Sequence, residues 1–302
     1  MDMPDVSFIV CTRSRPRRLL RAVGSIARTI ETCPDLRCEI VVMENGSQPE
    51  LRLDAEEIQS VSRPAECRLL WLDGGGLSVA RNAAMAAARG QLFIFTDDDC
   101  TVSLSYLSEL RKHLEDEGQD AIIGGSVIVP DPEDQHFTMK DAEEPQVYDP
   151  SWHPGGFVQG CNFAMTREVS LRIGPFDRRF GAGTPMRAGE DTDYLIRAHG
   201  VGVPILYFPD MRVNHYHGRT TRDEVKRLHR DYSFANGALY AKHLVQHPWL
   251  MRHFYYAARN AAKEPMGGAL FDRNHDLSWS SVVKQNIAGA VAFAVRGGKK
   301  RP

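Results

Sequence analysis

The sequence predicts an α/β protein with a mostly parallel central sheet flanked by helices, followed by a helical C-terminal extension. Two observations predict this fold class. Short apolar runs alternate with helix-like segments over residues 6–117, which is the order produced by crossover connections in a parallel sheet. From residue 221 onward, apolar residues recur at helical spacing without intervening strand-like runs.

Four short apolar runs are the predicted strands of the first half, at residues 6–11, 38–43, 68–72 and 92–96. Helices are predicted from Pro16 to Ile30, over 78–89 and over 105–117, because apolar residues repeat there at helical spacing. Residues 130–160 are rich in Pro and acidic residues and predict a long irregular segment, a candidate lid. Strands are predicted again at 157–165 and 203–208.

Composition excludes some classes of function. The chain of 302 residues has 37 Lys and Arg against 39 Asp and Glu, a net charge of −2, so we expect no nucleic-acid partner. The six cysteines form no CxxC pair, which is typical of buried reduced thiols in a cytoplasmic protein. No signal-peptide pattern opens the sequence, and the apolar stretch 287–295 is too short to span a bilayer.

Polar residues follow each predicted strand, at Thr12-Arg13, Glu44-Asn45, 73–76 and 97–99. Ligands of parallel sheets bind outside the carboxyl ends of the strands, so these clusters are expected to converge on one edge. Asp97, Asp98 and Asp99 would repel one another unless a cation neutralises them, and carboxylates suit Mg²⁺ or Mn²⁺. In an extended segment Asp97 and Asp99 project to the same side. The alternative is a solvated acidic turn or a helix cap.

Other polar residues are candidate partners of this triplet. The segment 74–82 (GGGLSVARN) matches no phosphate-loop pattern, but Arg81 in its helix is placed to orient the carboxylates or a diphosphate; the alternative is a surface salt bridge. Glu190 and Asp191 end a glycine-rich loop before a helix, where a carboxylate is either a general base or a cap. His215 and His217 share one side of an extended run, as metal or diphosphate contacts or as exposed histidines.

Taken in order, these motifs resemble glycosyltransferase family 2 over about residues 5–220. The motifs are TRSRP at 12–16, VVMENGS at 41–47, GLSVARNAA at 76–84, FTDDDC at 95–100, GCNFAM at 160–165, GPFDRRF at 174–180, GED at 189–191 and HYHG at 215–218. The resemblance implies the GT-A fold, a Rossmann-like nucleotide-binding sheet. It also implies a catalytic domain over 1–220, with the nucleotide sugar bound by about 1–125 and the acceptor by about 126–220, and a helical region over 221–302.

The resemblance also implies residue roles. The nucleotide sugar would be held by Thr12, Arg13, Arg15, Glu44, Asn45, Gly76, Arg81, Asp97 and Asp98. The metal would be held by Asp97, Asp99, His215 and His217, and the acceptor would lie near Asn162 and Trp152. Asp191 would be the general base, with Glu190 beside it. Glu44 stands where the family usually has Asp, so the contacts to the base of the nucleotide are expected to differ.

The expected activity is therefore a metal-dependent, inverting transfer of a sugar from a nucleotide-diphosphate sugar, with a UDP-sugar favoured, to an acceptor hydroxyl. The acceptor would be a carbohydrate, a lipid-linked molecule or a small molecule. One alternative is a sugar-phosphate nucleotidyltransferase, although TRSRP lacks the glycines that such an enzyme needs after its first strand. The other is a nucleotide-sugar-binding protein without activity, which intact Asp97, Asp99 and Asp191 argue against.

The C-terminal region has an uneven charge. No acidic residue follows Asp276, whereas Lys284, Arg296, Lys299, Lys300 and Arg301 do. The simpler interpretation is a set of helices packed on the catalytic domain. The other hypothesis is a platform for the acceptor or for a membrane surface, because an apolar stretch at 287–295 precedes the basic tail. The protein would then be cytoplasmic and peripheral at the inner face of a membrane; a homo-oligomer is a further hypothesis.

Overall fold

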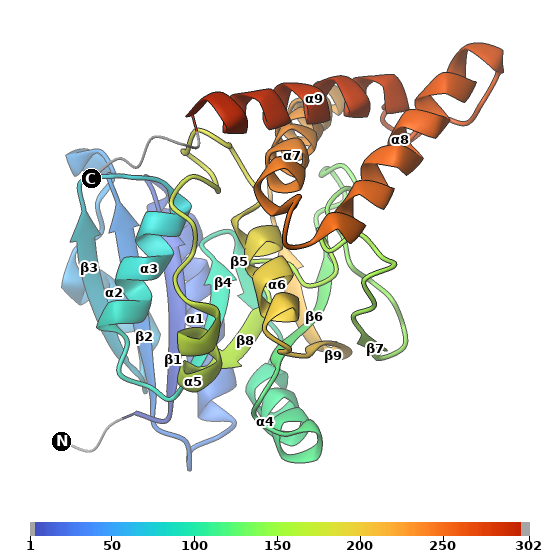
Figure 1. The fold of residues 1–302 in the computed structure, drawn as a ribbon. Coiled ribbons are helices and arrows are strands. Elements are labelled where there is room, and N and C mark those ends of the chain that lie inside the picture. Colours follow the sequence, from blue (N-terminus) through green and yellow to red (C-terminus); the bar gives the residue numbers. More distant parts are fainter. Residues whose placement is uncertain (1–3, 297–302) are drawn as a thin grey trace.

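The computed structural model describes residues 4–296, in which helices cover both faces of one sheet (Figure 1). The first half of the sheet is parallel, with strand order β3-β2-β1-β4. Its strands are β1 (Val6–Thr12), β2 (Cys38–Asn45), β3 (Glu66–Leu72) and β4 (Leu92–Asp97). The helices of this half are α1 (Pro16–Glu31), α2 (Ala55–Ser62), α3 (Leu77–Ala87) and α4 (Tyr106–Glu117). These bounds confirm the four predicted strands and the three predicted helices of this half, whereas α2 was not predicted.

The second half of the sheet mixes directions. Strand β8 (Phe163–Thr166) runs antiparallel between β4 and β6 (Ile122–Ile128), and β6 pairs in parallel with β9 (Ile205–His215). Two short strands, β5 (Cys100–Val102) and β7 (Gln146–Val147), pair antiparallel with β9. The helices that follow are α5 (Arg167–Ile173), α6 (Glu190–Gly200), α7 (Arg222–His243), α8 (Met251–Lys263) and α9 (Trp279–Arg296).

Three elements of this half differ from the sequence expectation. The strand predicted at 157–165 begins only at Phe163, because residues 157–162 form turns that carry Gly160 into the site. Strand β6 was not predicted: its apolar run contains Gly125, which packs so closely on β9 that a Cβ would lie 2.1 Å from the Met211 carbonyl oxygen. Strand β9 continues beyond the predicted end at 208, and a register shift in β6 accommodates it.

The carboxyl ends of the parallel strands converge as predicted. In the pairing registers, Thr12 lies opposite Glu44, and Cys11 lies opposite both Met43 and Asp97. The polar residues that follow β1, β2 and β4 therefore share one edge of the sheet. Two apolar clusters fill the two faces of the sheet, one beneath α1 and α4 and the other beneath α3, α5 and α6.

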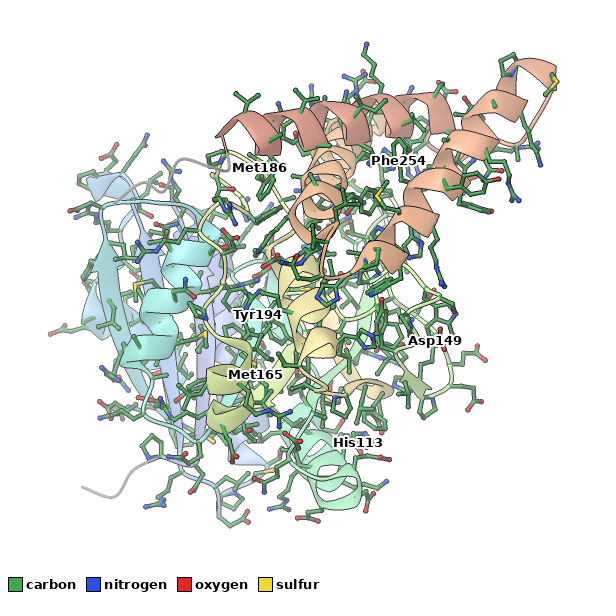
Figure 2. The ribbon with its side chains drawn as sticks, viewed as in Figure 1. His113, Asp149, Met165, Met186, Tyr194 and Phe254 are labelled. Carbon is green, nitrogen blue, oxygen red and sulfur yellow. The ribbon has the colours of Figure 1, made fainter. Side chains whose placement is uncertain are left out.

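The C-terminal helices pack onto the rest of the chain. A capping box between Thr221 and Glu224 begins α7. Helices α7 and α9 touch through glycines, since a Cβ on Gly237 would lie 1.8 Å from the Asn286 carbonyl oxygen. A third apolar cluster joins α6, α7 and the 180–188 loop, and it includes Met186 and partly buried Phe254, labelled in Figure 2. Among residues 4–296, no helix is both long and apolar enough to cross a membrane.

A buried ion network fastens α7 to α6. The side chain of Asp193 on α6 is fully buried, and its Oδ1 accepts a hydrogen bond from Lys242 Nζ at 2.5 Å and lies 2.8 Å from His243 Nε2. Its Oδ2 accepts from Arg197 Nε at 2.9 Å. Burial alone would raise the pKa of Asp193, but His243, Lys242 and Arg197 outweigh it and lower the pKa to about 2. The C-terminal helices thus depend on one ionised carboxylate.

Replacing this carboxylate should destabilise the protein. Asp193→Asn removes the carboxylate charge from His243 and Arg197 in a buried place, while Lys242 keeps only its pair with Asp177 Oδ2 at 2.7 Å, so we expect the free energy of unfolding to fall by about 3 kcal/mol at neutral pH. Asp231→Asn, which removes an exposed pair with Arg187, is the matched control and should cost at most about 1 kcal/mol. Urea unfolding measures both. Equal losses in the two variants would show that the network does not anchor α7.

The same network predicts a pH dependence. Because the pKa of Asp193 is lower in the folded protein than its unfolded value of about 4, its contribution is complete above that value. The contribution is lost as the pH falls toward the folded pKa of about 2. Between pH 5 and pH 2 the wild-type protein should therefore lose more stability than Asp193→Asn does.

Candidate active site

Arg81 on α3 joins the two acidic segments of the sequence. Its guanidinium is 2% exposed. Nη1 donates a hydrogen bond to Glu190 Oε1 at 3.0 Å, and Nη2 donates to Asp97 Oδ1 at 3.3 Å and to the Gly160 carbonyl oxygen at 2.9 Å. One buried cation thus holds the end of β4, the start of α6 and the 157–162 turns together, and the alternative of a surface salt bridge is wrong.

The local backbone allows this approach through two glycines. Gly160 lies so close to Arg81 that a Cβ would be 2.8 Å from Nη1 and 3.2 Å from Asp191 Oδ2. Gly189 adopts a φ of +82°, in the left-handed region that favours glycine, and turns the chain into α6. Gly160 was not identified from the sequence as a site residue. Its place as the first residue of the GCNFAM motif was the available signal.

Glu190 and Asp191 form the first turn of α6, whereas the sequence predicted them at the end of the loop before the helix, and their surroundings differ from each other. Glu190 is buried against Arg81; burial and the charge of Asp191 raise its pKa, while Arg81 opposes that rise. Asp191 is partly exposed, and its Oδ2 accepts a hydrogen bond from the Gly160 amide at 3.0 Å while its Oδ1 accepts from the Thr192 amide at 2.6 Å. Asp191 is therefore the more accessible carboxylate of the two, and Glu190 is the partner of Arg81.

The carboxylate triplet does not lie in an extended strand. Asp97 ends β4, whereas Asp98 and Asp99 form the turn into β5. Asp97 therefore faces Arg81, and Asp98 and Asp99 share Arg15, whose Nη1 lies 3.2 Å from Asp98 Oδ1 and 3.1 Å from Asp99 Oδ2. We expected strand alternation to place Asp97 and Asp99 on one side. That reasoning is wrong, because Asp99 does not lie in the strand. The turn, rather than strand alternation, sets where each carboxylate points.

The surroundings of Asp98 and Asp99 shift the pKa values of these two carboxyl groups in opposite directions. Asp98 accepts a hydrogen bond from Thr12 Oγ1 at 2.6 Å, and burial raises its pKa to about 6. Burial has the same tendency at Asp99, but His215, Arg15 and Arg18 outweigh it and lower the pKa of Asp99 to about 2. Arg18 was missed by the sequence analysis, although its spacing of three residues from Arg15 places both on one helix face.

His215 is the predicted metal ligand that lies next to Asp99. His215 ends β9, and its Nε2 lies 3.5 Å from Asp99 Oδ1. Its Nδ1 is buried and has no hydrogen-bond partner among the described residues. Burial lowers the pKa of His215, but Asp99 outweighs that effect and raises it to about 9, so a cation would have to displace this proton. Carboxylate oxygens match the ligand preferences of Mn²⁺ and Mg²⁺, whereas the imidazole is a ligand that softer transition-metal ions also accept.

His217 does not belong to this donor set. Its Nε2 lies 3.1 Å from the Gln135 carbonyl oxygen, and its Nδ1 accepts a hydrogen bond from the Arg219 amide at 3.0 Å. Both ring nitrogens are thus occupied, and the buried ring also lies 3.6 Å from Asp134. The prediction of His217 as a metal ligand is corrected, because the ring anchors the irregular 130–160 segment to the chain after β9.

The residues predicted to hold the nucleotide lie at the same edge with unequal access. Arg13 is exposed, and the Asn45 side chain has a buried oxygen with no hydrogen-bond partner in the described chain. Glu44 is buried and accepts a hydrogen bond from the Ser47 hydroxyl, and burial raises its pKa. Gly76 does not open onto the edge: a Cβ there would lie 2.5 Å from Thr184 Cγ2, so its role is close packing at the start of α3.

The two predicted acceptor residues have different places. Asn162 is fully buried, its Nδ2 donates to the carbonyl oxygens of Ser126 and Met211, and its Oδ1 accepts from the Tyr106 hydroxyl. It therefore has no free polar atom for an acceptor, and that prediction is corrected. Trp152 is 46% exposed in the turns beside Phe157.

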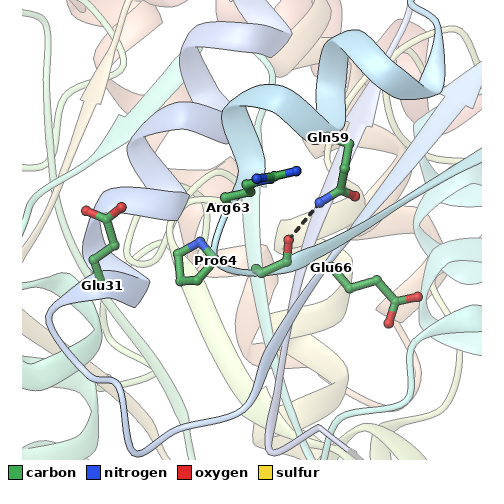
Figure 3. Close-up of a pocket in the computed structure, with 6 residues that line it drawn as sticks. Glu31, Gln59, Arg63, Pro64 and Glu66 are labelled. Atoms are coloured by element: carbon green, nitrogen blue, oxygen red, sulfur yellow. Dashed lines mark hydrogen bonds between the residues drawn. The ribbon is translucent and has the colours of Figure 1, made fainter.

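Figure 3 shows a surface hollow that lies elsewhere. It is lined by Glu31, Gln59, Arg63, Pro64, Ala65 and Glu66, which come from the ends of α1 and α2 and the start of β3. These are at the amino ends of the parallel strands, opposite the edge that carries Asp97. The hollow is therefore no part of the candidate active site.

Known proteins are similar to this chain in sequence and in fold. One relative is the succinoglycan biosynthesis protein ExoM of Rhizobium meliloti (strain 1021), 27% identical over 207 residues, which are 68% of this chain and 64% of ExoM. Another is the glycosyltransferase AglE of Haloferax volcanii, 22% identical over 69% of this chain and 66% of AglE. The chain thus spans slightly less than two thirds of the length of these relatives.

Three solved structures have a similar fold. A mannosyltransferase from Pyrobaculum calidifontis, in complex with GDP-Man and Mn²⁺, has a TM-score of 0.61 at 18% identity and covers 99% of this chain and 89% of its own. GalNAc-T7 with UDP, GalNAc and Mn²⁺ has a TM-score of 0.55 at 17% identity, over 79% of this chain and 51% of its own. S. aureus TarS 1-349 with UDP has a TM-score of 0.57 at 14% identity, over 99% and 93%. The predicted GT-A fold is confirmed.

The family model described as glycosyl transferase family 2 matches residues 7–175, more than half of the chain. The matched segment contains Arg81, the carboxylate triplet and Gly160, and it ends before Glu190 and Asp191. The chain belongs to glycosyl transferase family 2.

Proposed function

We propose that the protein transfers a sugar from a nucleotide-diphosphate sugar to an acceptor hydroxyl, with inversion at the anomeric carbon. The observation that carries the proposal is the bridge through Arg81, which places a candidate cation site and a candidate base on either side of one buried guanidinium. A single displacement requires the sugar donor and the acceptor to meet between the cation and the base. Membership of the family favours sugar transfer over nucleotidyl transfer.

Asp97, Asp99 and His215 are the proposed ligands of Mg²⁺ or Mn²⁺. The mannosyltransferase and GalNAc-T7 structures contain Mn²⁺, and their fold is shared by this chain. When bound, the cation would act as a Lewis acid that stabilises the charge on the departing diphosphate. Arg15 and Arg18 already face Asp99, and they are placed to share in binding that charge. UDP is bound in two of the three complexes, so we propose a UDP-sugar as donor.

Asp191 is the proposed general base. Hydrogen bonds from the Gly160 and Thr192 amides orient its carboxylate at the start of α6, where it is partly exposed. The acceptor hydroxyl would give its proton to Asp191 as its oxygen bonds to the anomeric carbon, while the bond to the diphosphate breaks on the opposite face. Glu190 would keep Arg81, and through it Asp97, in place. The exposed indole of Trp152 is a candidate contact for the acceptor.

The base assignment predicts a separation of binding from catalysis. Asp191→Asn preserves the hydrogen bond from Gly160 but cannot take a proton, so transfer should fall by at least about 100-fold while donor binding is kept. Asp120→Asn, an exposed carboxylate at the amino edge of the sheet, is the control and should retain activity. Release of nucleotide diphosphate measures transfer, and a donor-dependent thermal shift measures binding. Transfer by Asp191→Asn at the wild-type rate would disprove the assignment.

The cation assignment predicts that donor binding depends on Asp99. A nucleotide sugar with Mn²⁺ should raise the melting temperature of the wild-type protein, because a ligand that binds only the folded state stabilises it. Asp99→Asn should lose most of this shift, whereas Asp116→Asn on the exposed end of α4 should keep it. The melting temperature without ligand is compared first, to separate loss of binding from loss of folding. A full Mn²⁺-dependent shift in Asp99→Asn would remove Asp99 from the ligand set.

We also propose that α9 lies on an anionic lipid surface. Ile287, Val291 and Val295 form an outward apolar stripe, each more than half exposed, while Val282 and Asn286 face α7. Lys284 is exposed as well, and the chain has no acidic residue after Asp276, which complements a negatively charged membrane. The basic tail of Lys299, Lys300 and Arg301 lies outside the described residues, and nothing is inferred from its structure.

A single acidic substitution tests this surface. Val291→Glu should abolish flotation of the protein with anionic liposomes, whereas Leu171→Glu on α5, 76% exposed and far from α9 in Figure 1, should leave it intact. Absence of flotation by the wild-type protein would refute the proposal. If Val291→Glu instead dissociates a dimer in light scattering, the stripe is occupied by a second copy of the chain.

A further inference from the structure

Two thiols lie at the base of the active site and take no part in the mechanism above. Cys100 follows Asp99 directly, and Cys161 follows Gly160. Both are at least nine-tenths buried. A sulfur atom from each and one ring nitrogen of His215 all lie within 4.8 Å of one another.

The fold holds these three side chains in place through backbone pairing. Cys100 on β5 is the register partner of His215 on β9. Cys161 is fixed from both sides, because the Gly160 carbonyl is bound by Arg81 and the Asn162 amide bridges β6 and β9. The buried amide of Asn162, which offers nothing to an acceptor, thus positions Cys161 next to His215.

Asp99 is a neighbour of this group, although its carboxylate is not among the donor atoms that all lie within 4.8 Å of one another. Asp99 Oδ1 lies 4.0 Å from Cys100 Sγ and 3.5 Å from His215 Nε2. Two sulfurs, one nitrogen and one oxygen are a donor set that tetrahedral Zn²⁺ accepts. The donor atoms around such an ion would be about 3.5 Å apart. The donor atoms of this cluster would therefore have to move closer together by up to about 1 Å to enclose the ion.

The chemistry of these donors differs from that of the catalytic cation. Carboxylates select hard ions such as Mg²⁺ and Mn²⁺, whereas thiolates favour Zn²⁺ and similar ions. Burial raises the pKa of the Cys100 thiol, so an ion that binds here must displace protons. Disulfide formation would instead need an oxidant, and all six cysteines are free in this structure.

We propose that Cys100, Cys161, His215 and Asp99 form a second cation site, specific for a thiophilic divalent ion of the Zn²⁺ type. The site shares His215 and Asp99 with the proposed Mg²⁺ or Mn²⁺ site, so the two ions exclude each other. Zn²⁺ would therefore oppose donor binding. This last consequence rests on the proposed function, whereas the thiol site itself does not.

Co²⁺ is the probe that distinguishes the two sites, because thiolate ligands give it an intense charge-transfer absorption that oxygen ligands do not. Titration of the full-length reduced protein with Co²⁺ should develop this band at one ion per chain, and Zn²⁺ should remove it. Cys100→Ser and Cys161→Ser should each weaken the band and lower Co²⁺ affinity by about tenfold or more. Cys67→Ser, which removes a half-buried thiol on β3 away from the site, is the matched control and should behave as wild type.

The result that overturns the proposal is a wild-type protein that binds Co²⁺ without the charge-transfer band, or a band that survives in both active-site variants. If the protein loses two free thiols during the titration and takes up no Co²⁺, the proposal is also overturned. Melting temperatures are measured first, and Cys161→Ala replaces any variant that does not fold.

A second measurement separates this proposal from the proposed function. In wild type, Zn²⁺ should abolish the Mn²⁺-dependent thermal shift by a UDP-sugar, and in Cys161→Ser it should do so only at about tenfold higher concentration or more. A wild-type protein with no Mn²⁺-dependent shift but with the Co²⁺ band would refute the proposed function and keep the thiol site.

Discussion

The site depends on the ion pairs and the hydrogen bond that the buried guanidinium of Arg81 makes. The guanidinium pairs with Glu190 and Asp97, which are far apart in the sequence, and it also binds the Gly160 carbonyl. Breaking a buried ion pair by removing one partner costs several kcal/mol, because the remaining charge stays unsolvated. The relative positions of the proposed cation ligand Asp97 and of the first turn of α6 therefore depend on this one guanidinium.

Helix α6 connects this site to the C-terminal helices. Its first turn carries Glu190 and Asp191, and Asp193, two residues further on, binds Lys242 and His243 of α7. A displacement of α7 would therefore move the helix that presents the proposed base. The C-terminal helices are in this sense coupled to the proposed active site, and α9 carries the outward apolar stripe.

Hard and soft donors stand next to each other around Asp99 and His215. The carboxylates suit the ions found in the structures with a similar fold, while Cys100 and Cys161 add a preference that those ions do not satisfy. The cation that binds would then depend on whether the carboxylates or the two thiols coordinate it. Because Asp99 and His215 serve both sets, selection between ions is built into two side chains.

The sequence by itself determined the first four strands, the position of the carboxylates at the end of β4 and a helix after the glycine-rich loop that ends at Gly189, because these follow from local periodicity, glycine placement and strand ends. Only the tertiary structure decided that His217 and Asn162 are structural, that Asp98 and Asp99 lie in a turn, and that Cys100 meets Cys161. The physical reason is that each of these depends on a partner from a distant segment. The strand order and the register of β6, β8 and β9 choose that partner, and β6 and β9 approach through a glycine whose packing leaves no periodic signal.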